Sequence, residues 1–286
     1  MNTLTKRTLS GTLFIIIMVT CLLGSKWSFA ALMVFIMSTM IFEFCRITIG
    51  KSHPLSQVMT IISGIVFFLL IFFHAGWGLH VKFVALAIIP VFILMVHSLY
   101  VKDKSDYHTY ASMYTALLYI AVPISLSNLI IFTQHEYNGL LILAFYIIIW
   151  STDVGGYIFG CSFGKNGKKL FPSISPKKSW AGFWGGMFMA IVCAIVLTQV
   201  GLLLAPDMVT GVPSRKLPII HCIGLAIVMD IAGVYGDLFE SQWKRHYDVK
   251  DSGNLIPGHG GLLDRFDSSL FALPAGALYL SLFDLL

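Results

Sequence analysis

Residues 139–160 read GLLILAFYIIIWSTDVGGYIFG, and the first twelve of them carry no charge. A helix built from this stretch is apolar on every side, whereas a surface helix of a soluble protein keeps a polar stripe. Runs of about 18 or more apolar residues are typical of helices that cross a membrane. The stretch therefore predicts a membrane-spanning helix.

The same character extends along the whole chain of 286 residues, which is 57% hydrophobic and only 12% charged. Soluble domains contain about 25% charged residues, so too few charges remain here to cover a water-facing surface. Helices are the expected spanning form because lipid cannot satisfy open backbone groups. We predict an all-α polytopic membrane protein with about nine transmembrane helices. The predicted spans are residues 9–24, 27–44, 58–73, 81–99, 111–132, 139–160, 183–204, 218–236 and 268–285.

The Lys and Arg residues fall unevenly on the two sides of these spans. With the N-terminus placed inside, fifteen of the nineteen lie in inside segments. Cytoplasmic loops carry such an excess of Lys and Arg in membrane proteins. The bias predicts a cytoplasmic N-terminus. It also predicts that the two longest inside segments, residues 151–182 and 237–267, face the cytoplasm as polar loops.

The N-terminal residues, the cysteines and the net charge each narrow the prediction. Residues 28–30 resemble the cleavage site of a signal peptide, but the apolar run resumes at once, which favours an uncleaved first span. The five cysteines form no CxxC pair, so neither a disulfide framework nor a zinc site is indicated. The net charge of +5 is explained by topology, and we predict no nucleic-acid partner.

The second polar segment carries two groups of acids. Asp237, Glu240 and Ser241 are spaced to share one face of a helix, and Asp264 and Asp267 are spaced in the same way. Two carboxylate pairs that meet at the membrane surface suit a hard divalent cation. Mg²⁺ in particular binds one or two carboxylates together with phosphate oxygens of a substrate.

Glycines and lysines in these segments point to phosphate. Residues 257–261 read PGHGG, and such a turn can present backbone N–H groups to an anion. The first polar segment has no acid between Gly155 and Gly182 and carries the lysines Lys165, Lys168, Lys169, Lys177 and Lys178. Lysines that only set topology and glycines that only pack helices are the alternative interpretation. Asp153 is a further candidate, because an acid at bilayer depth is costly and usually functional.

The second polar segment resembles the signature of the phosphatidate cytidylyltransferases, the CDP-diacylglycerol synthases. That pattern runs Ser-x-apolar-Lys-Arg, four residues, Lys-Asp, a short link to Pro-x-His-Gly-Gly, and Asp-Arg-x-Asp. Trp243 stands where the family usually has an aliphatic residue or Phe. The residues in register are Ser241, Lys244, Arg245, Lys250, Asp251, Pro257, His259, Gly260, Gly261, Asp264, Arg265 and Asp267.

The first polar segment is similar to another part of the same family. Ala181 stands where many members have an acid, so the role of that position is in doubt. The matching residues are Asp153, Tyr157, Gly160, Phe163, Gly164, Ser175, Pro176, Lys177, Lys178, Ser179 and Trp180.

The resemblance implies an enzyme of phospholipid biosynthesis in a bacterial inner membrane. It would transfer the cytidylyl group of CTP to phosphatidate, giving CDP-diacylglycerol and pyrophosphate, with Mg²⁺ and with or without a second cation. For this reaction we assign catalytic roles, as a hypothesis, to Asp237, Lys250, Asp251, His259, Asp264 and Asp267, of which Asp237 and Asp264 would bind the metal. Under the same hypothesis the substrates contact Ser175, Lys177, Lys178, Ser241, Lys244, Arg245, Gly260, Gly261 and Arg265.

On this interpretation residues 1–136 form an N-terminal transmembrane region and residues 137–286 form the catalytic region. Two alternatives stay open. The first is another lipid-directed cytidylyltransferase or a prenol kinase with a similar metal site. The second is an anion transporter, although no paired repeats are visible. The sequence does not determine the acyl-chain preference. It also does not determine whether the protein is a monomer or a homodimer.

Overall fold

The structure, a computed structural model, describes residues 3–50, 53–100, 107–133, 135–206, 213–258 and 260–286. The chain forms two compact units. The N-terminal unit consists of Met1–Tyr137 and Val249–Arg265, and the C-terminal unit consists of Asn138–Asp248 and Phe266–Leu286. Each unit therefore combines two separate pieces of the chain.

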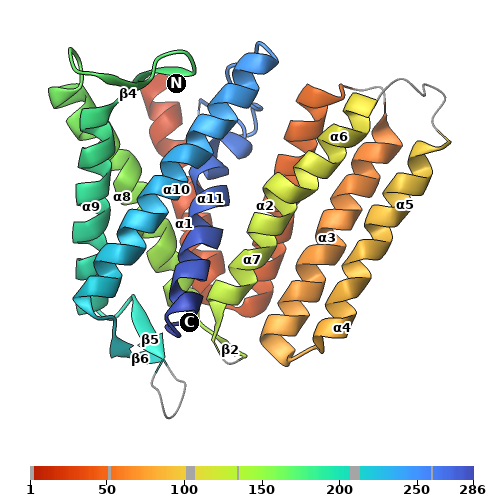
Figure 1. Ribbon diagram of the computed structural model, residues 1–286, viewed down its shortest axis with the longest axis horizontal. Helices are drawn as coiled ribbons and strands as arrows, with labels where there is room; N and C mark the ends of the chain where they lie inside the picture. The colour runs from red at the N-terminus through yellow and green to blue at the C-terminus, as the bar shows by residue number, and fades with distance from the viewer. Residues whose placement is uncertain (1–2, 51–52, 101–106, 134, 207–212, 259) are drawn as a thin grey trace. The chain divides into compact units, whose positions relative to one another are not determined.

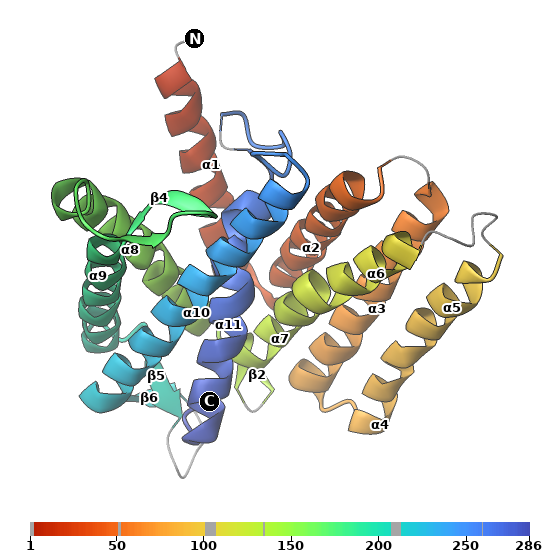
Figure 2. The same cartoon turned by 45° about the horizontal axis from the view of Figure 1, so that its top comes forward.

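The N-terminal unit is a bundle of helices (Figure 1). Helices α2, α3 and α5 lie side by side in Figures 1 and 2, and the segment from α6 to α7 packs along α3. Apolar side chains such as Phe29, Met37 and Phe68 are fully buried in it. Its elements are α1 (Thr3–Gly24), α2 (Lys26–Thr48), α3 (Pro54–Trp77), α4 (Val81–Val84), η1 (Ala85–Ala87), α5 (Ile88–Ser98), α6 (Tyr107–Ala116), η2 (Leu117–Ala121), α7 (Val122–Ile131), β1 (Phe132–Thr133) and β2 (Glu136–Tyr137).

Local sequence explains where these helices begin and adjust. Ser25 and Ser28 form a capping box at the start of α2, because each side chain accepts a hydrogen bond from the other residue's backbone N–H. Pro123 has no backbone N–H and cannot donate to the carbonyl one turn earlier. The turn η2, which ends two residues before Pro123, is π-helical and accommodates this irregularity of the helix.

The C-terminal unit is built on α8, α9 and α10, which lie side by side in both views (Figures 1 and 2). Helices α8 and α9 approach closely through small residues: a Cβ added at Gly155 would lie 2.7 Å from the carbonyl oxygen of Gly185. The elements are α8 (Gly139–Phe163), β3 (Lys169–Phe171), β4 (Ser175–Ser179), α9 (Trp180–Gln199), β5 (Leu204–Pro206), β6 (Pro213–Lys216), α10 (Ile219–His246) and α11 (Leu263–Leu282), whose first turn belongs to the N-terminal unit.

The predicted fold class is confirmed. Eight helices within the described residues are long and apolar enough to cross a membrane, so the chain is an all-α polytopic integral membrane protein. The ninth predicted span, residues 268–285, corresponds to α11, which is not among the eight. Its first turn is polar, with Asp264, Arg265 and Asp267. The count of nine spans and the division at residue 136 stay predictions.

The two predicted polar loops need a correction, because both begin as helix. Helix α8 continues to Phe163 and helix α10 continues to His246, so Asp153 and Asp237 are helical residues. The predicted span 139–160 already contained Asp153 and overlapped the first loop, whereas the predicted span 218–236 ended just before Asp237. A helix has no reason to stop there, since its backbone bonds are internal and polar side chains suit an end that leaves the lipid. In α10 the ion pair of Glu240 and Lys244, one turn apart, supports the extension.

Candidate functional site

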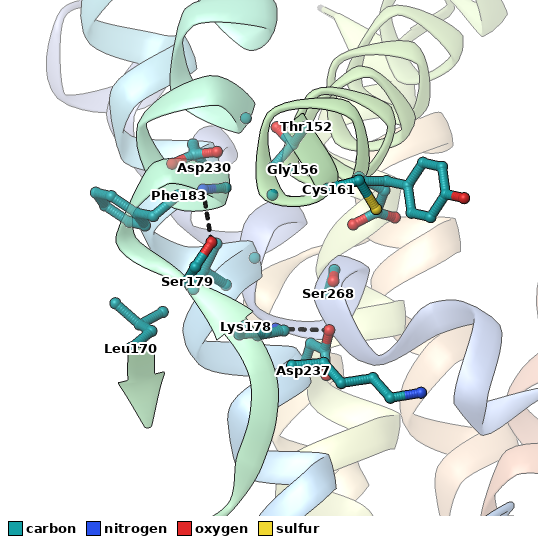
Figure 3. A pocket seen from close by; sticks show the side chains of 18 of the residues that line it. Thr152, Gly156, Cys161, Leu170, Lys178, Ser179, Phe183, Asp230, Asp237 and Ser268 are labelled. Carbon is teal, nitrogen blue, oxygen red and sulfur yellow. Dashed lines mark hydrogen bonds and ion pairs between the residues drawn. The ribbon is translucent and has the colours of Figure 1, made fainter. Parts of the chain in front are cut away.

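A cavity of about 650 Å³ lies in the C-terminal unit among α8, α9, α10 and the β3–β4 hairpin (Figure 3). Its walls include apolar side chains such as Ile149, Phe183 and Met229. Its charged residues are Asp153, Lys165, Lys169, Lys177, Lys178, Asp230 and Asp237. A partly apolar hollow with a few convergent charges is the usual form of a small-molecule site.

The hairpin that carries the lysines is fixed at both ends. Strands β3 and β4 pair antiparallel, with Lys169 opposite Ser179. Ser179 then caps α9, because its hydroxyl accepts a hydrogen bond from the N–H of Gly182 at 3.2 Å. A Cβ at Gly164 would collide with the Ser179 hydroxyl, so glycine is required there. The hairpin lies over the ends of α8 and α9 (Figure 2), and its residues Lys177 and Lys178 line the cavity.

Asp237 and Lys178 meet at the cavity. The Lys178 Nζ lies 2.6 Å from the Asp237 Oδ2, and the two side chains point toward each other in Figure 3. The hydroxyl of Ser241 donates to the other carboxylate oxygen of Asp237 at 3.2 Å. Both ends of the ion pair are partly open to solvent, with 27% and 29% of the side chains exposed. A phosphate can therefore reach Lys178 and a cation can reach Asp237.

Further acids gather next to Asp237. Asp267 lies near enough to Asp237, Glu240 and Asp153 for their negative charges to act on it. Glu240 is fully buried and is paired with Lys244 at 2.5 Å. Within the part of the chain that the structure describes, no three His, Cys, Asp or Glu side chains are arranged as a complete metal site. A cation held here would take its remaining ligands from substrate or water, which is the usual mode of Mg²⁺.

The other half of the resemblance lies in the N-terminal unit, in a glycine-rich segment (described residues 252–258 and 260–264). Asp264 Oδ2 accepts two backbone hydrogen bonds, from Ser252 N–H at 2.9 Å and from Gly261 N–H at 2.8 Å. Gly260 adopts a φ of 87°, which is accessible mainly to glycine. Ile256 and Gly260 form an isolated antiparallel bridge. These hydrogen bonds connect Asp264, in the first turn of α11, to the glycine-rich segment that precedes it.

Glu43 of α2 also contacts the glycine-rich segment, and the sequence interpretation did not include it. The side chain is only 5% exposed and accepts hydrogen bonds from Ser252, Leu262 and Leu263. Asp230, 1% exposed at the cavity, was also missed. The signal was available in both cases. Each residue is an acid inside a predicted apolar span, and such residues are functional candidates by default.

The predicted site residues thus fall into two groups. The C-terminal unit contains Ser175, Lys177, Lys178, Asp237, Ser241, Lys244, Arg245 and Asp267. The N-terminal unit contains Lys250, Asp251, Gly260, Gly261, Asp264 and Arg265. Ser175 begins β4 but does not line the cavity, whereas the adjacent Pro176 does. Lys250, Asp251 and Arg265 are exposed, and His259 lies outside the described residues. The predicted roles of all these residues stay predictions.

Comparison with known proteins identifies the family. The sequence matches the Cytidylyltransferase family over residues 5–283. The chain belongs to this family. One relative is a phosphatidate cytidylyltransferase of Bacillus subtilis (strain 168), which is 33% identical over 97% of this chain and 98% of its own length. Another, from Staphylococcus aureus (strain COL), is 33% identical over 70% of each chain. A third, from Staphylococcus haemolyticus (strain JCSC1435), is 37% identical over 64% of each chain.

The predicted family is therefore confirmed, and the match extends beyond the motifs that suggested it. The cytidylyltransferase match begins near the N-terminus and includes α2 and Glu43. The resemblance seen in the sequence covered only the second half of the chain with specific residues. The N-terminal helices are thus part of the family's architecture and not an unrelated anchor.

Proposed function

We propose that the protein transfers the cytidylyl group of CTP to phosphatidate, giving CDP-diacylglycerol and pyrophosphate. The observation that carries the proposal is the family match along almost the whole chain, with a relative named phosphatidate cytidylyltransferase that covers 97% of it. The cavity supports it, because lysines and an acid meet there between apolar helices. An amphiphilic phosphate such as phosphatidate suits such a setting.

The reaction needs charge control more than it needs a protein nucleophile. An oxygen of the phosphatidate phosphate attacks the α-phosphorus of CTP, a new P–O bond forms, and the bond to the β-phosphate breaks to release pyrophosphate. The attacking group is already an anion, so no side chain has to attack first. Both substrates are negative, and positioning by cations is therefore the main requirement. Lys177 and Lys178 are the side chains proposed to hold phosphate, with Lys165 and Lys169 at the same cavity.

A divalent cation is part of the proposal, and Mg²⁺ is the ion that the donor set suits. Carboxylate oxygens are the ligands that Mg²⁺ prefers. Asp237 is partly exposed at the cavity, and the carboxyl group of Asp267 is near it. Asp264 is the second proposed ligand of the cation. When bound, the ion would stabilise charge on the transferred phosphoryl group.

The cellular setting follows from the substrates. CTP is a cytosolic nucleotide and phosphatidate is a membrane lipid, so we propose a bacterial inner-membrane enzyme whose polar site faces the cytoplasm. The excess of Lys and Arg in the predicted inside segments supports this orientation. Apolar cavity residues such as Ile149, Met229 and Val234 would lie toward the acyl chains.

A turnover assay on the purified protein in detergent tests the proposed function. It supplies phosphatidate, radiolabelled CTP and Mg²⁺, and compares wild type with Asp237→Asn and with an EDTA-treated sample. The matched control is Asp284→Asn, the same change at an exposed position near the C-terminus. We expect labelled CDP-diacylglycerol from wild type and the control, and about a 100- to 1000-fold lower rate from Asp237→Asn. Folded wild type that uses a prenyl phosphate and not phosphatidate would contradict the proposal.

A further inference from the structure

Glu43 is a buried carboxylate that is held entirely by uncharged donors. Its Oε1 accepts the backbone N–H of Leu262 at 3.0 Å. Its Oε2 accepts the backbone N–H of Leu263 at 2.9 Å and the hydroxyl of Ser252 at 3.2 Å. Within the described residues Glu43 forms no salt bridge. These three bonds therefore compensate for the burial of its charge.

The two backbone donors lie where α11 begins. The first N–H groups of a helix have no acceptor inside the helix, and the N-terminal end of the helix dipole is positive. Leu263 is the first residue of α11. A carboxylate contributed by α2 is thus the acceptor for this end of α11, more than 200 residues away in the sequence.

The glycine-rich segment closes around the Glu43 carboxylate so tightly that side chains do not fit. A Cβ added at Gly261 would lie 2.6 Å from Glu43 Oε2, and one added at Gly253 would lie 2.5 Å from Oε1. Real Cβ atoms do not approach oxygen atoms that closely. Glycine at position 253 therefore leaves room for Glu43, and glycine at position 261 leaves room for Glu43, for the Ser252 hydroxyl and for the Gly253 nitrogen.

The contacts of Glu43 and Asp264 are coupled through shared residues. Ser252 donates its hydroxyl to Glu43 and its backbone N–H to Asp264. Gly261 N–H binds Asp264, and the next amide, of Leu262, binds Glu43. A shift of the Glu43 carboxylate would therefore displace the donors that fix Asp264.

We propose that Glu43 is a positioning residue for the cytidylyl transfer. It acts from α2 on the glycine-rich segment and sets the orientation of Asp264, without touching a substrate. This inference rests on the proposed function, because it assigns Asp264 and its segment to the reaction. Residues that orient the groups of a metal or phosphate site typically change affinity or rate by about 10- to 100-fold when they are removed.

The test is Glu43→Gln, with Glu136→Gln as the matched control. Glu136 is exposed in the same unit, so it undergoes the same chemical change outside the contact network. Glutamine offers only one acceptor oxygen, and its NH₂ group would face one of the donors. We expect kcat to fall about 10- to 100-fold while the KM for CTP changes less than about threefold. The control should match wild type in both.

A second readout does not depend on activity. Hydrogen–deuterium exchange should become faster in peptides that cover Val249–Arg265 and should stay unchanged in peptides from α8 and α9. Ser252→Ala removes one of the three hydrogen bonds to Glu43 and should speed exchange in the same peptides by a smaller amount. If Glu43→Gln does not fold, Ser252→Ala becomes the deciding variant. Unchanged exchange in the segment, or equally faster exchange in every helix, overturns the inference. If wild type makes no CDP-diacylglycerol, the proposed function fails, while the exchange data still decide whether Glu43 holds the segment.

Discussion

The glycine-rich segment and the Asp237 cavity both present carboxylates, but the two regions hold them in different ways. At the glycine-rich segment, Asp264 and Glu43 of α2 accept hydrogen bonds from backbone N–H groups. At the cavity, Asp237 is paired with a lysine side chain and both partners are partly exposed. Backbone donors fix a geometry, because they move only if the chain moves. A partly exposed ion pair contributes only about 0–1 kcal/mol and can exchange partners.

This difference suggests separate tasks in one reaction. The lysine at the cavity can leave Asp237 for a phosphate at little cost, and Asp237 can then accept a cation. The glycine-rich segment offers no such freedom, since its acids and amides satisfy one another. We infer that one region is built to exchange charges with substrates and that the other is built to keep its shape.

The largest effect that would separate these tasks is expected for Asp264→Asn. The amide oxygen of asparagine can still accept the N–H groups of Ser252 and Gly261, so the segment should keep its shape. The substitution removes the negative charge. If that charge serves the reaction, turnover should fall about 100- to 1000-fold while hydrogen exchange of Val249–Arg265 stays at the wild-type rate. Full turnover with unchanged exchange would make Asp264 a purely structural residue and would remove it from the proposed metal ligands.

A smaller effect is expected for Gly261→Ala, which tests whether the segment is rigid. The new Cβ would meet Glu43 Oε2 and the Gly253 nitrogen, each at 2.6 Å, and would also collide with the Ser252 hydroxyl. Overpacking of this kind costs about 1–3 kcal/mol. The apparent unfolding temperature in detergent should fall below that of wild type.

Gly167→Ala is the matched control for this change, because its Cβ would have no neighbour closer than 3.5 Å. Its unfolding temperature should equal that of wild type. If Gly261→Ala also unfolds at the wild-type temperature, the segment can relax, and the contrast between a fixed and an exchangeable region would not hold.

The sequence predicted the fold class, but it did not predict the network that fixes the glycine-rich segment. Apolar blocks identify spanning helices because a lipid environment leaves few alternatives for the backbone. Lys177, Lys178 and Asp237 stood out because charges are rare in this chain, and the structure brings them to one cavity. The end of α10 was misjudged by ten residues because hydropathy reports where lipid ends and not where a helix ends.

Glu43 could have been found from the sequence alone. It is the only acid among the first 102 residues and lies within an apolar block. What the sequence could not provide is its partner. Two of its three bonds go to backbone amides of Leu262 and Leu263, and a backbone amide has no signature in a sequence. Contacts of this kind depend on tertiary structure and appear only when the fold is known.

The smallest expected effect concerns Lys178→Ala, and Lys168→Ala is its control. Both changes remove one positive charge from the same hairpin region, but Lys168 is exposed and does not line the cavity. Loss of a contact with a charged phosphate should raise the KM for CTP about 10-fold, equivalent to about 1.4 kcal/mol. The unfolding temperature should stay near that of wild type, because the Lys178–Asp237 pair is partly exposed and contributes little to stability. Steady-state kinetics over a range of CTP concentrations measures the KM, and thermal unfolding measures the unfolding temperature.

If Lys168→Ala raised the KM equally, the lysines would act only through overall charge. If Lys178→Ala lowered the unfolding temperature as far as Gly261→Ala does, the ion pair would be structural, and Lys178 would not be available to exchange Asp237 for a substrate phosphate.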